Sequence, residues 1–418
     1  MNSKERIHQT FKHRMPDRVP LDFGGLSCTS MHVLLIDKLR DLFGLPKHPV
    51  KVLEPFTMIG EFEDDLRGLL HIDTCNITAP GTVYGLTKTD WKPWTFHHTE
   101  VLVPGNFNIT EAGKGGYYLF SQGDTTCEPS GYMPAGGYYF DALPRPLNQN
   151  LEECNIQENK ADYILWEKEK YDFYLKQVQK YKDSGKFLII AGLGTNLGDP
   201  IEVLKPASKE RPRGIRTFEN WMMALSIDPD SIQEVFEYQT DIAIQNFSNF
   251  PQEIVKSVDM AYVCGSDIGT QAGYLFSPKV IREVYMPYYK KINDWLHNNF
   301  GWKTIKHSCG ANWDMLPIFI EAGFDAFTPV QTSAAGMDPK KLKETYGKDI
   351  VFWGGGVDVQ KTLPFGTSME VYNQVLDRLE IFSKDGGYVF NAIHNLQPGI
   401  PIKNLEAMFK AFYKFNGM

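Results

Sequence analysis

The sequence predicts an α/β fold: a TIM-type (β/α)8 barrel with an inserted β and loop segment in its N-terminal half. The second half alternates short β-branched or apolar runs with amphipathic helical stretches, an order typical of parallel strands joined by helices. The run at 187–194 is almost continuously apolar, as in a strand that is buried on both faces. Because the pattern shows no reversal of strand order, we expect residues 1–418 to form one closed barrel.

Local signals define the first elements. Residues 3–13 place Ile7 and Phe11 on one helical face, with Ser3 as the N-cap. The stretch 18–23 predicts a strand that ends at two glycines, where the backbone can turn sharply. Helices over 31–43 and 54–70 and a strand over 70–75 are expected to follow.

Residues from about 80 to 160 interrupt this alternation. They contain clustered aromatic residues and turns rich in Gly and Pro, which predict an insertion of hairpins and loops. The insertion could shape the substrate site as a lid, or it could be structural. After it, the strand and helix units resume, and we expect helix 160–184, strand 187–194, helices 218–225 and 230–250, strand 259–264, helix 278–298, strand 304–307, helix 313–322, strand 326–331, helix 339–346, strand 350–353, helix 369–383, strand 388–391 and helix 402–415.

The composition is that of a soluble globular protein, with 418 residues of which 42% are hydrophobic and 22% charged. A net charge of -8 with scattered basic residues argues against a nucleic-acid surface. No apolar run reaches the roughly 18 residues needed to cross a bilayer, so no membrane association is expected. The mixed-charge N-terminus is no signal peptide, and the 6 cysteines show no disulfide pattern. We therefore expect a cytoplasmic protein, of open oligomeric state, a homodimer included.

The stretch 304–310 delivers His307 and Cys309 at the end of a predicted strand. Residues i and i+2 of a strand point to one side, so an imidazole and a thiolate can reach one point in space. His394 follows another strand and could supply a third ligand for zinc, which accepts nitrogen and sulfur. The alternative is a buried histidine satisfied by the backbone and a cysteine that packs as a small apolar residue.

The other candidate residues also lie at strand ends or in the insertion. Asp267 could act as a general acid or base, orient His307, or cap a helix. Gln331 could occupy the fourth metal position or bind substrate, and we include both residues as catalytic candidates. The candidates for substrate binding are Gly25, Cys28, Gln271, Tyr139 and Asp358, the last of which could instead fix a turn.

Five stretches together resemble the uroporphyrinogen decarboxylase superfamily. They are 264–271, 307–310, 325–339, 354–360 and 386–408. Within the superfamily the chain is similar to the corrinoid-dependent methyltransferases, because the arginine-rich N-terminal segment that grips porphyrinogen carboxylates in the decarboxylase is replaced by Asp22-Phe23-Gly24-Gly25-Leu26-Ser27-Cys28.

The resemblance implies a zinc ion held by His307, Cys309 and a third residue, which is cysteine in the methyltransferases and His394 here. It implies methyl transfer between a small methylated compound (a methoxy aromatic, a methylamine or a thiol) and the cobalt of a corrinoid on a separate protein. The substitution of histidine for cysteine leaves a metal-free decarboxylase of a small carboxylated substrate as the alternative, with Asp267 or His394 as proton donor. A non-catalytic binding barrel is a third option.

Overall fold

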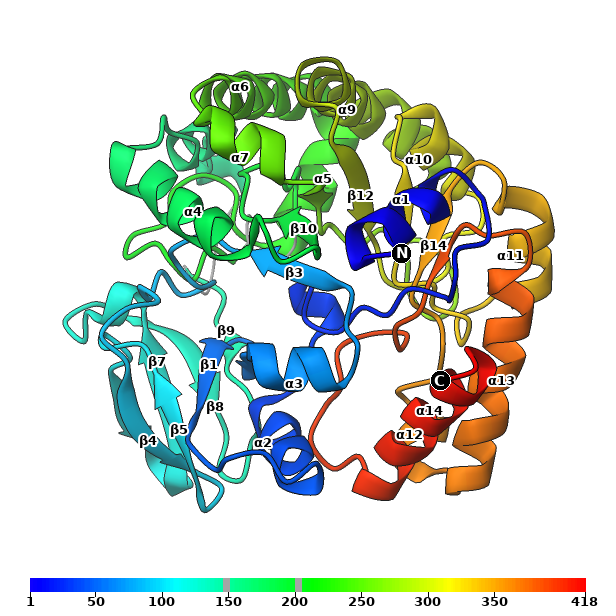
Figure 1. Cartoon of the computed structure of the whole chain (residues 1–418). Coiled ribbons are helices and arrows are strands. Elements are labelled where there is room, and N and C mark those ends of the chain that lie inside the picture. Colours follow the sequence, from blue (N-terminus) through cyan, green and yellow to red (C-terminus); the bar gives the residue numbers. More distant parts are fainter. Residues whose placement is uncertain (146–150, 200–204) are drawn as a thin grey trace.

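The computed structural model describes residues 1–145, 151–199 and 205–418. Its central sheet has seven strands in the order β15-β14-β13-β12-β11-β10-β3, and every neighbouring pair is parallel. Helices surround this sheet (Figure 1). The strands are β3 Thr74–Ile77, β10 Phe187–Ile190, β11 Met260–Cys264, β12 Lys303–His307, β13 Ala326–Thr328, β14 Val351–Trp353 and β15 Tyr388–Val389.

Residues 20–22 close the sheet into a barrel. Leu21 forms a parallel bridge with Phe390, which follows β15. On the other side, the Asp73 amide donates to the Leu21 carbonyl at 2.8 Å, just before β3 begins. The strand predicted over 18–23 therefore supplies the eighth strand position of the barrel. It is shorter than expected, because Gly24 takes a positive φ of 83° and ends it. The prediction of a TIM barrel is confirmed.

Helix α1 (Ser3–Phe11) covers the N-terminal end of the barrel. Its Ile7 belongs to the buried cluster inside the barrel, together with Phe187, Ile305 and Trp353. The N-cap of α1 is Asn2 rather than the predicted Ser3, and it forms a capping box with Glu5. With this end filled by apolar side chains, the opposite end, where the strands finish, is left for a site.

The remaining helices form the outer layer. They are α2 Val33–Leu42, α3 Asp64–Leu69, α4 Lys168–Tyr181, α5 Phe218–Ile227, α6 Pro229–Ser248, α7 Gln252–Ser257, α8 Pro278–Val280, α9 Met286–Phe300, α10 Leu316–Glu321, α11 Pro339–Tyr346, α12 Thr362–Phe365, α13 Ser368–Ser383 and α14 Ile402–Phe415. A π-helical stretch, Ile281–Tyr285, joins α8 to α9.

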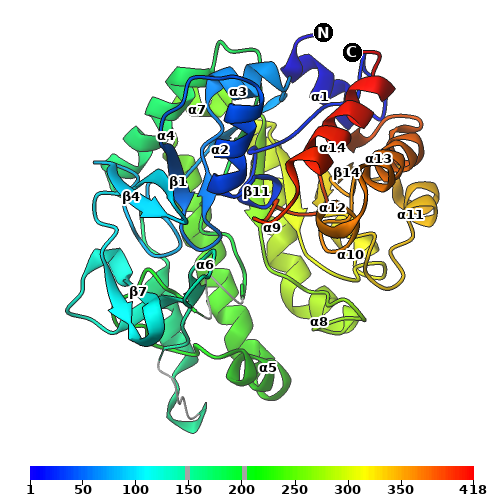
Figure 2. The same ribbon diagram turned by 90° about the horizontal axis from the view of Figure 1, so that it is seen from below.

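Two further sheets of four strands lie beside the barrel. One has the order β2-β1-β5-β4 and the other β6-β7-β8-β9. Their strands are β1 Val50–Glu54, β2 Ile59–Gly60, β4 Lys92–Phe96, β5 Thr99–Val103, β6 Ile109–Ala112, β7 Gly116–Phe120, β8 Pro129–Met133 and β9 Asp141–Ala142. Figure 2 shows β7 and α1 at opposite ends of the molecule, which places the second sheet on the side of the barrel mouth.

The predicted helix over 54–70 is wrong. The alternating residues of 50–54 form β1, the chain turns through Pro55 into β2, and only 64–69 is helical. The apolar residues at 52, 53, 56, 58, 59 and 62 also fit a helical period, so the pattern alone could not separate a bent hairpin from a helix.

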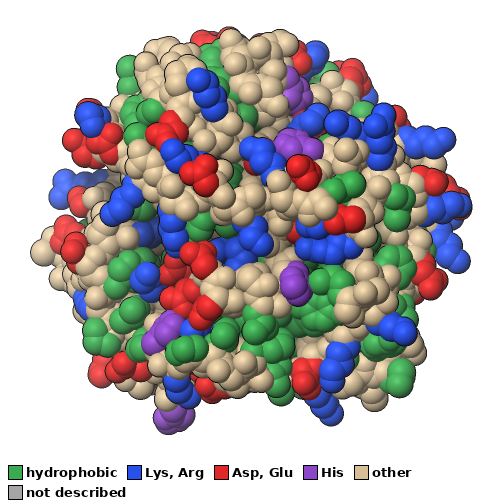
Figure 3. Space-filling view, viewed as in Figure 1, with side chains coloured by type: hydrophobic (Ala, Val, Ile, Leu, Met, Phe, Trp, Pro, Cys, Tyr) green, Lys and Arg blue, Asp and Glu red, His purple; other side chains and the backbone are tan. Residues whose placement is uncertain are grey.

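In the part of the chain that the structure describes, no helix is both long and apolar enough to cross a bilayer. Acidic and basic side chains are intermixed over the face of the molecule in Figure 3. That face therefore lacks, in its described residues, the broad basic patch that phosphate backbones require.

Candidate metal centre

Strand β12 directs His307 into the mouth of the barrel. Ile305, two residues earlier, packs in the cluster inside the barrel, so His307 lies on the same side. Gly310 then takes a φ of 85°, and a Cβ at this position would lie 2.5 Å from the Gly269 carbonyl carbon. Only glycine allows this turn, which folds the chain back next to the loop after β11.

Three potential metal ligands meet at this point. One ligand atom from each of His307, Cys309 and His394 lies within 4.8 Å of the other two. The Cys309 Sγ is 3.5 Å from the His307 Nε2, and the two imidazole rings lie 5.6 Å apart at 69°. The structure thus brings together the residues predicted as zinc ligands.

The electrostatics of this cluster favour a thiolate. Burial alone would raise the pKa of the Cys309 thiol, but the charge and hydrogen bond of His307 lower this pKa to about 7, with a further contribution from His394. Against the effect of its burial, the pKa of His307 lies well above the ordinary value, because Tyr262 and other nearby groups favour the cation. A thiolate is the form of cysteine that binds metal.

Asp267, in the loop after β11, contacts two of these residues. Its Oδ1 accepts a hydrogen bond from the Cys309 amide at 2.7 Å and lies 3.4 Å from the His307 Nε2. Burial would raise the pKa of Asp267, but the hydrogen bond and charge of His307 hold it at about 2. This carboxyl group is therefore ionised at neutral pH.

Two amide side chains hold the loops that carry the ligands. The Gln331 Oε1 accepts from the Gly310 amide at 2.6 Å, next to Cys309. The Asn395 Oδ1 lies 2.6 Å from the His394 Nδ1, and Gln397 donates to the same oxygen at 2.9 Å. Because this contact engages Nδ1, it leaves Nε2 of His394 as the ligand atom. The sequence analysis did not select Asn395 as a site residue, although its position next to His394 indicated that it could contact this ligand.

Lys306 is a second residue that the pattern did not identify. It is fully buried, and its Nζ donates to the Ser266 carbonyl at 2.7 Å and to the His307 carbonyl. The ammonium group also lies over the rings of Tyr289 and Phe319. Lys306 therefore fastens the end of β12 to the loop that carries Asp267.

The candidates for substrate binding are dispersed. Cys28 is half-buried and interacts electrostatically with His307. Gly25 is buried, and a Cβ there would lie 2.5 Å from the Asp22 Oδ1, so glycine is needed for packing. Gln271 and Tyr139 are exposed on loops, and the Asp358 Oδ1 accepts from the amide of Gln360 at 2.7 Å in a local turn. A role of these residues in substrate binding stays a prediction.

Comparisons with known proteins bear on the sequence and on the fold of the chain. The sequence profile described as uroporphyrinogen decarboxylase (URO-D) matches residues 212–415, which include all three potential ligands. The C-terminal half of this chain is thus similar to uroporphyrinogen decarboxylase (URO-D). A methyltransferase from Methanosarcina mazei has a similar structure, with a TM-score of 0.55, 15% identity and 99% of each chain covered. At that identity the similarity concerns the fold alone.

Two glycoside hydrolases give weaker structural matches. The GH53 catalytic domain of Ignisphaera aggregans has a TM-score of 0.38 and 12% identity over 96% of each chain. Endo-glycoceramidase II from Rhodococcus sp. has a TM-score of 0.34 and 10% identity, over 61% of this chain and 68% of the other. No curated protein matches the sequence.

Proposed function

We propose that this protein is a zinc-dependent methyltransferase, which moves a methyl group between a small methylated compound and the cobalt of a separate corrinoid protein. The observation that carries the proposal is the meeting of His307, Cys309 and His394 at the mouth of the barrel. A metal-free enzyme has no evident need for an ionisable thiol between two imidazoles at that point.

The cluster fits zinc in its distances and in its donor set. In a tetrahedral zinc site, a sulfur and a nitrogen ligand are about 3.6 Å apart. The Cys309 Sγ and the His307 Nε2 are 3.5 Å apart. Two nitrogens and one sulfur leave one position open, as in catalytic rather than structural zinc sites. Bound zinc would supply a Lewis acid for the methyl donor or acceptor.

The residues around the cluster would hold and orient these ligands. Asp267 would stay ionised, hold the Cys309 backbone through its Oδ1 and place a negative charge beside the His307 Nε2. Asn395 would keep the His394 ring turned with Nε2 toward the cluster, and Gln331 would fix the turn at Gly310. Such outer contacts fix the orientation and basicity of metal ligands.

The substrates follow from the class of reaction. A methoxy aromatic, a methylamine or a thiol is a suitable small partner, and the corrinoid would be carried by a separate protein that docks over the mouth. The β6–β9 sheet lies on that side and is a candidate for one wall of the docking site. We place this reaction in the cytoplasm.

The decarboxylase alternative is weaker. It needs a group that can donate a proton near neutral pH. Asp267 has a pKa of about 2 and cannot serve as that donor. His394 could, but it lies against Cys309, which such a reaction does not use.

The proposal is tested by an assay of methyl transfer in which the absorption spectrum of the corrinoid cobalt reports the reaction. Purified protein is mixed with a methylated corrinoid protein and a thiol, or with the reduced corrinoid protein and a panel of methyl donors, and the cobalt absorption spectrum is followed. We expect the spectrum to change with wild type and with the control Cys127→Ser, whose thiol lies in the insertion. Cys309→Ser and His307→Ala should abolish the change and the bound zinc together. Full methyl-transfer activity of the zinc-free protein would refute the proposal. So would a decarboxylase activity that Cys309→Ser and His307→Ala both retain.

A further inference from the structure

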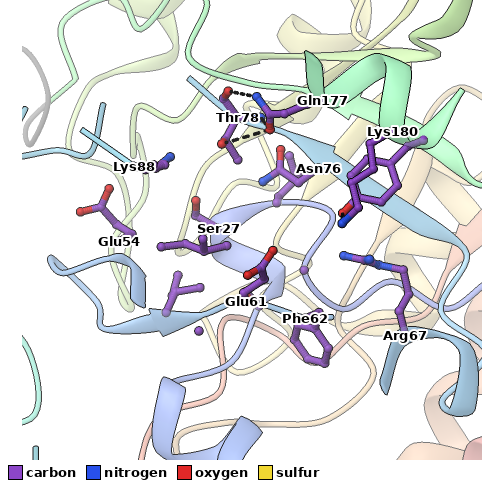
Figure 4. A pocket seen from close by; sticks show the side chains of 17 residues that line it. Ser27, Glu54, Glu61, Phe62, Arg67, Asn76, Thr78, Lys88, Gln177 and Lys180 are labelled. Carbon is purple, nitrogen blue, oxygen red and sulfur yellow. Dashed lines mark hydrogen bonds between the residues drawn. The ribbon is translucent and has the colours of Figure 1, made fainter. Parts of the chain in front are cut away.

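A cavity lies beside the barrel, apart from the metal centre. It has a volume of about 190 Å³ and is enclosed by the loop 24–30, β1 and β2, the end of β3 and helix α4 (Figure 4). None of the three potential metal ligands lines it. Because a single water needs about 15 Å³ of such space, the cavity has room for a ligand of up to about twelve non-hydrogen atoms.

Two opposite charges of this cavity, Lys88 and Glu54, form no direct salt bridge among the described residues, although they attract each other at longer range. The Lys88 Nζ makes one hydrogen bond, to the Ala79 carbonyl at 3.1 Å, and no carboxylate among the described residues lies within 4.0 Å of it. The Glu54 carboxylate accepts from the amides of Phe56 at 3.1 Å and Val83 at 2.9 Å, but has no cation that close in the described chain. Figure 4 shows both side chains reaching the cavity from the same side.

The other charges on the wall each have a direct salt bridge, but Arg67 and Lys180 share one carboxylate, which leaves one positive charge in excess. Arg67 and Lys180 contact Asp64 at 2.7 and 3.3 Å, and Glu61 contacts Lys51 at 3.1 Å. Lys88 and Glu54 are thus the wall charges that form no direct salt bridge among the described residues, and each favours the charged form of the other at longer range. Both side chains are buried, and burial lowers the pKa of Lys88 to about 8 and raises the pKa of Glu54.

We infer that this cavity binds a small zwitterion, whose carboxylate contacts Lys88 and whose ammonium contacts Glu54. A simple anion would be repelled by Glu54, and a simple cation by Lys88 and Arg67. A compound that carries both charges gains a charge-assisted hydrogen bond at each end, and such bonds are the strong ones. The ligand class is therefore a short amino acid or a similar compound.

The site adjoins the metal centre through one loop. Leu26 and Ser27 line the cavity, and the next residue, Cys28, interacts electrostatically with His307. The inference does not depend on zinc or on methyl transfer, because no residue of the metal centre contributes to the cavity.

The test is isothermal titration calorimetry with glycine, acetate and methylamine as probes. We expect glycine to bind at least ten-fold more tightly than either single-charge probe. Lys88→Met should abolish glycine binding. Glu54→Gln should weaken the binding of glycine but strengthen the binding of acetate. The control Lys92→Met, on β4 and outside the cavity lining, should bind glycine like wild type.

A second measurement uses the wild-type protein alone. Limited acetylation with acetic anhydride, followed by peptide mass spectrometry, should modify Lys88, and glycine should slow this modification while leaving Lys92 unaffected. The inference would be overturned if acetate bound as tightly as glycine, or if Lys88→Met bound glycine like wild type. It would also be overturned if glycine gave no heat of binding and did not protect Lys88 from acetylation.

Discussion

Replacing Asp267 by asparagine tests whether the metal centre depends on a charge that does not itself bind the metal. Asparagine keeps an oxygen that can accept from the Cys309 amide, so the change removes the charge and preserves the hydrogen bond. Zinc would replace the proton on the His307 Nε2, 3.4 Å from the Asp267 Oδ1, and would bring one more unit of positive charge; one unit of charge at that distance is worth about 5 kcal/mol at an effective dielectric constant of 20. Since the Asp267 side chain is 37% exposed, solvent reduces this energy, and we expect about 1.5–3 kcal/mol.

That energy corresponds to a loss of about 10–100-fold in zinc affinity, the usual range for such outer contacts. The assay is competition for zinc against a chromophoric chelator, with Asp267→Asn and Asp267→Ala compared. Alanine also removes the acceptor for the Cys309 amide, so it should cost about 1 kcal/mol more. If both variants bound zinc as tightly as wild type, the reasoning about Asp267 would be wrong.

Three further predictions concern other parts of the molecule. Lys306→Met leaves the Ser266 and His307 carbonyls without their buried donor, so it should lower the free energy of unfolding by about 2 kcal/mol in urea titration, and an unchanged midpoint would contradict this. Lys88→Met should raise that free energy by up to about 3 kcal/mol at pH 7, because the folded-state pKa of about 8 lies below the ordinary 10.5. Between pH 8 and 10.5 the unfolded wild-type chain binds more protons than the folded one, so the stability of wild type should rise with pH. The difference in stability between Lys88→Met and wild type should therefore vanish by about pH 10.5. A difference that does not change with pH would show that the lowered pKa of Lys88 is not its cause. After zinc removal, the rate of Cys309 alkylation by iodoacetamide should rise with a midpoint near pH 7, whereas a midpoint near 8.5 would show an unperturbed thiol.

The barrel and its strand ends could be predicted because their signals are local. The β-branched run before His307 and the apolar run at 187–190 each specify a buried strand without knowledge of their neighbours. The spacing of His307 and Cys309 then follows from the period of a strand, and His394 follows from the rule that parallel strands end at one edge.

Other features depend on contacts between distant residues. Lys306 belongs to the most exposed residue types, and only the packing of Tyr289 and Phe319 shows that it is buried. The cavity combines Glu54 from β1 with Lys88, Arg67 and Lys180 from three other segments. No spacing in the sequence predicts that meeting, and the helix wrongly expected over 54–70 would have directed Glu54 elsewhere.

The most direct test of the metal centre is X-ray absorption at the zinc edge of the purified protein. One sulfur at about 2.3 Å and two imidazole nitrogens at about 2.0–2.1 Å are expected, with a light fourth ligand. The sulfur contribution should disappear in Cys309→Ser and persist in Cys127→Ser. A zinc shell without sulfur, or one that Cys309→Ser leaves unchanged, would contradict a centre formed by His307, Cys309 and His394.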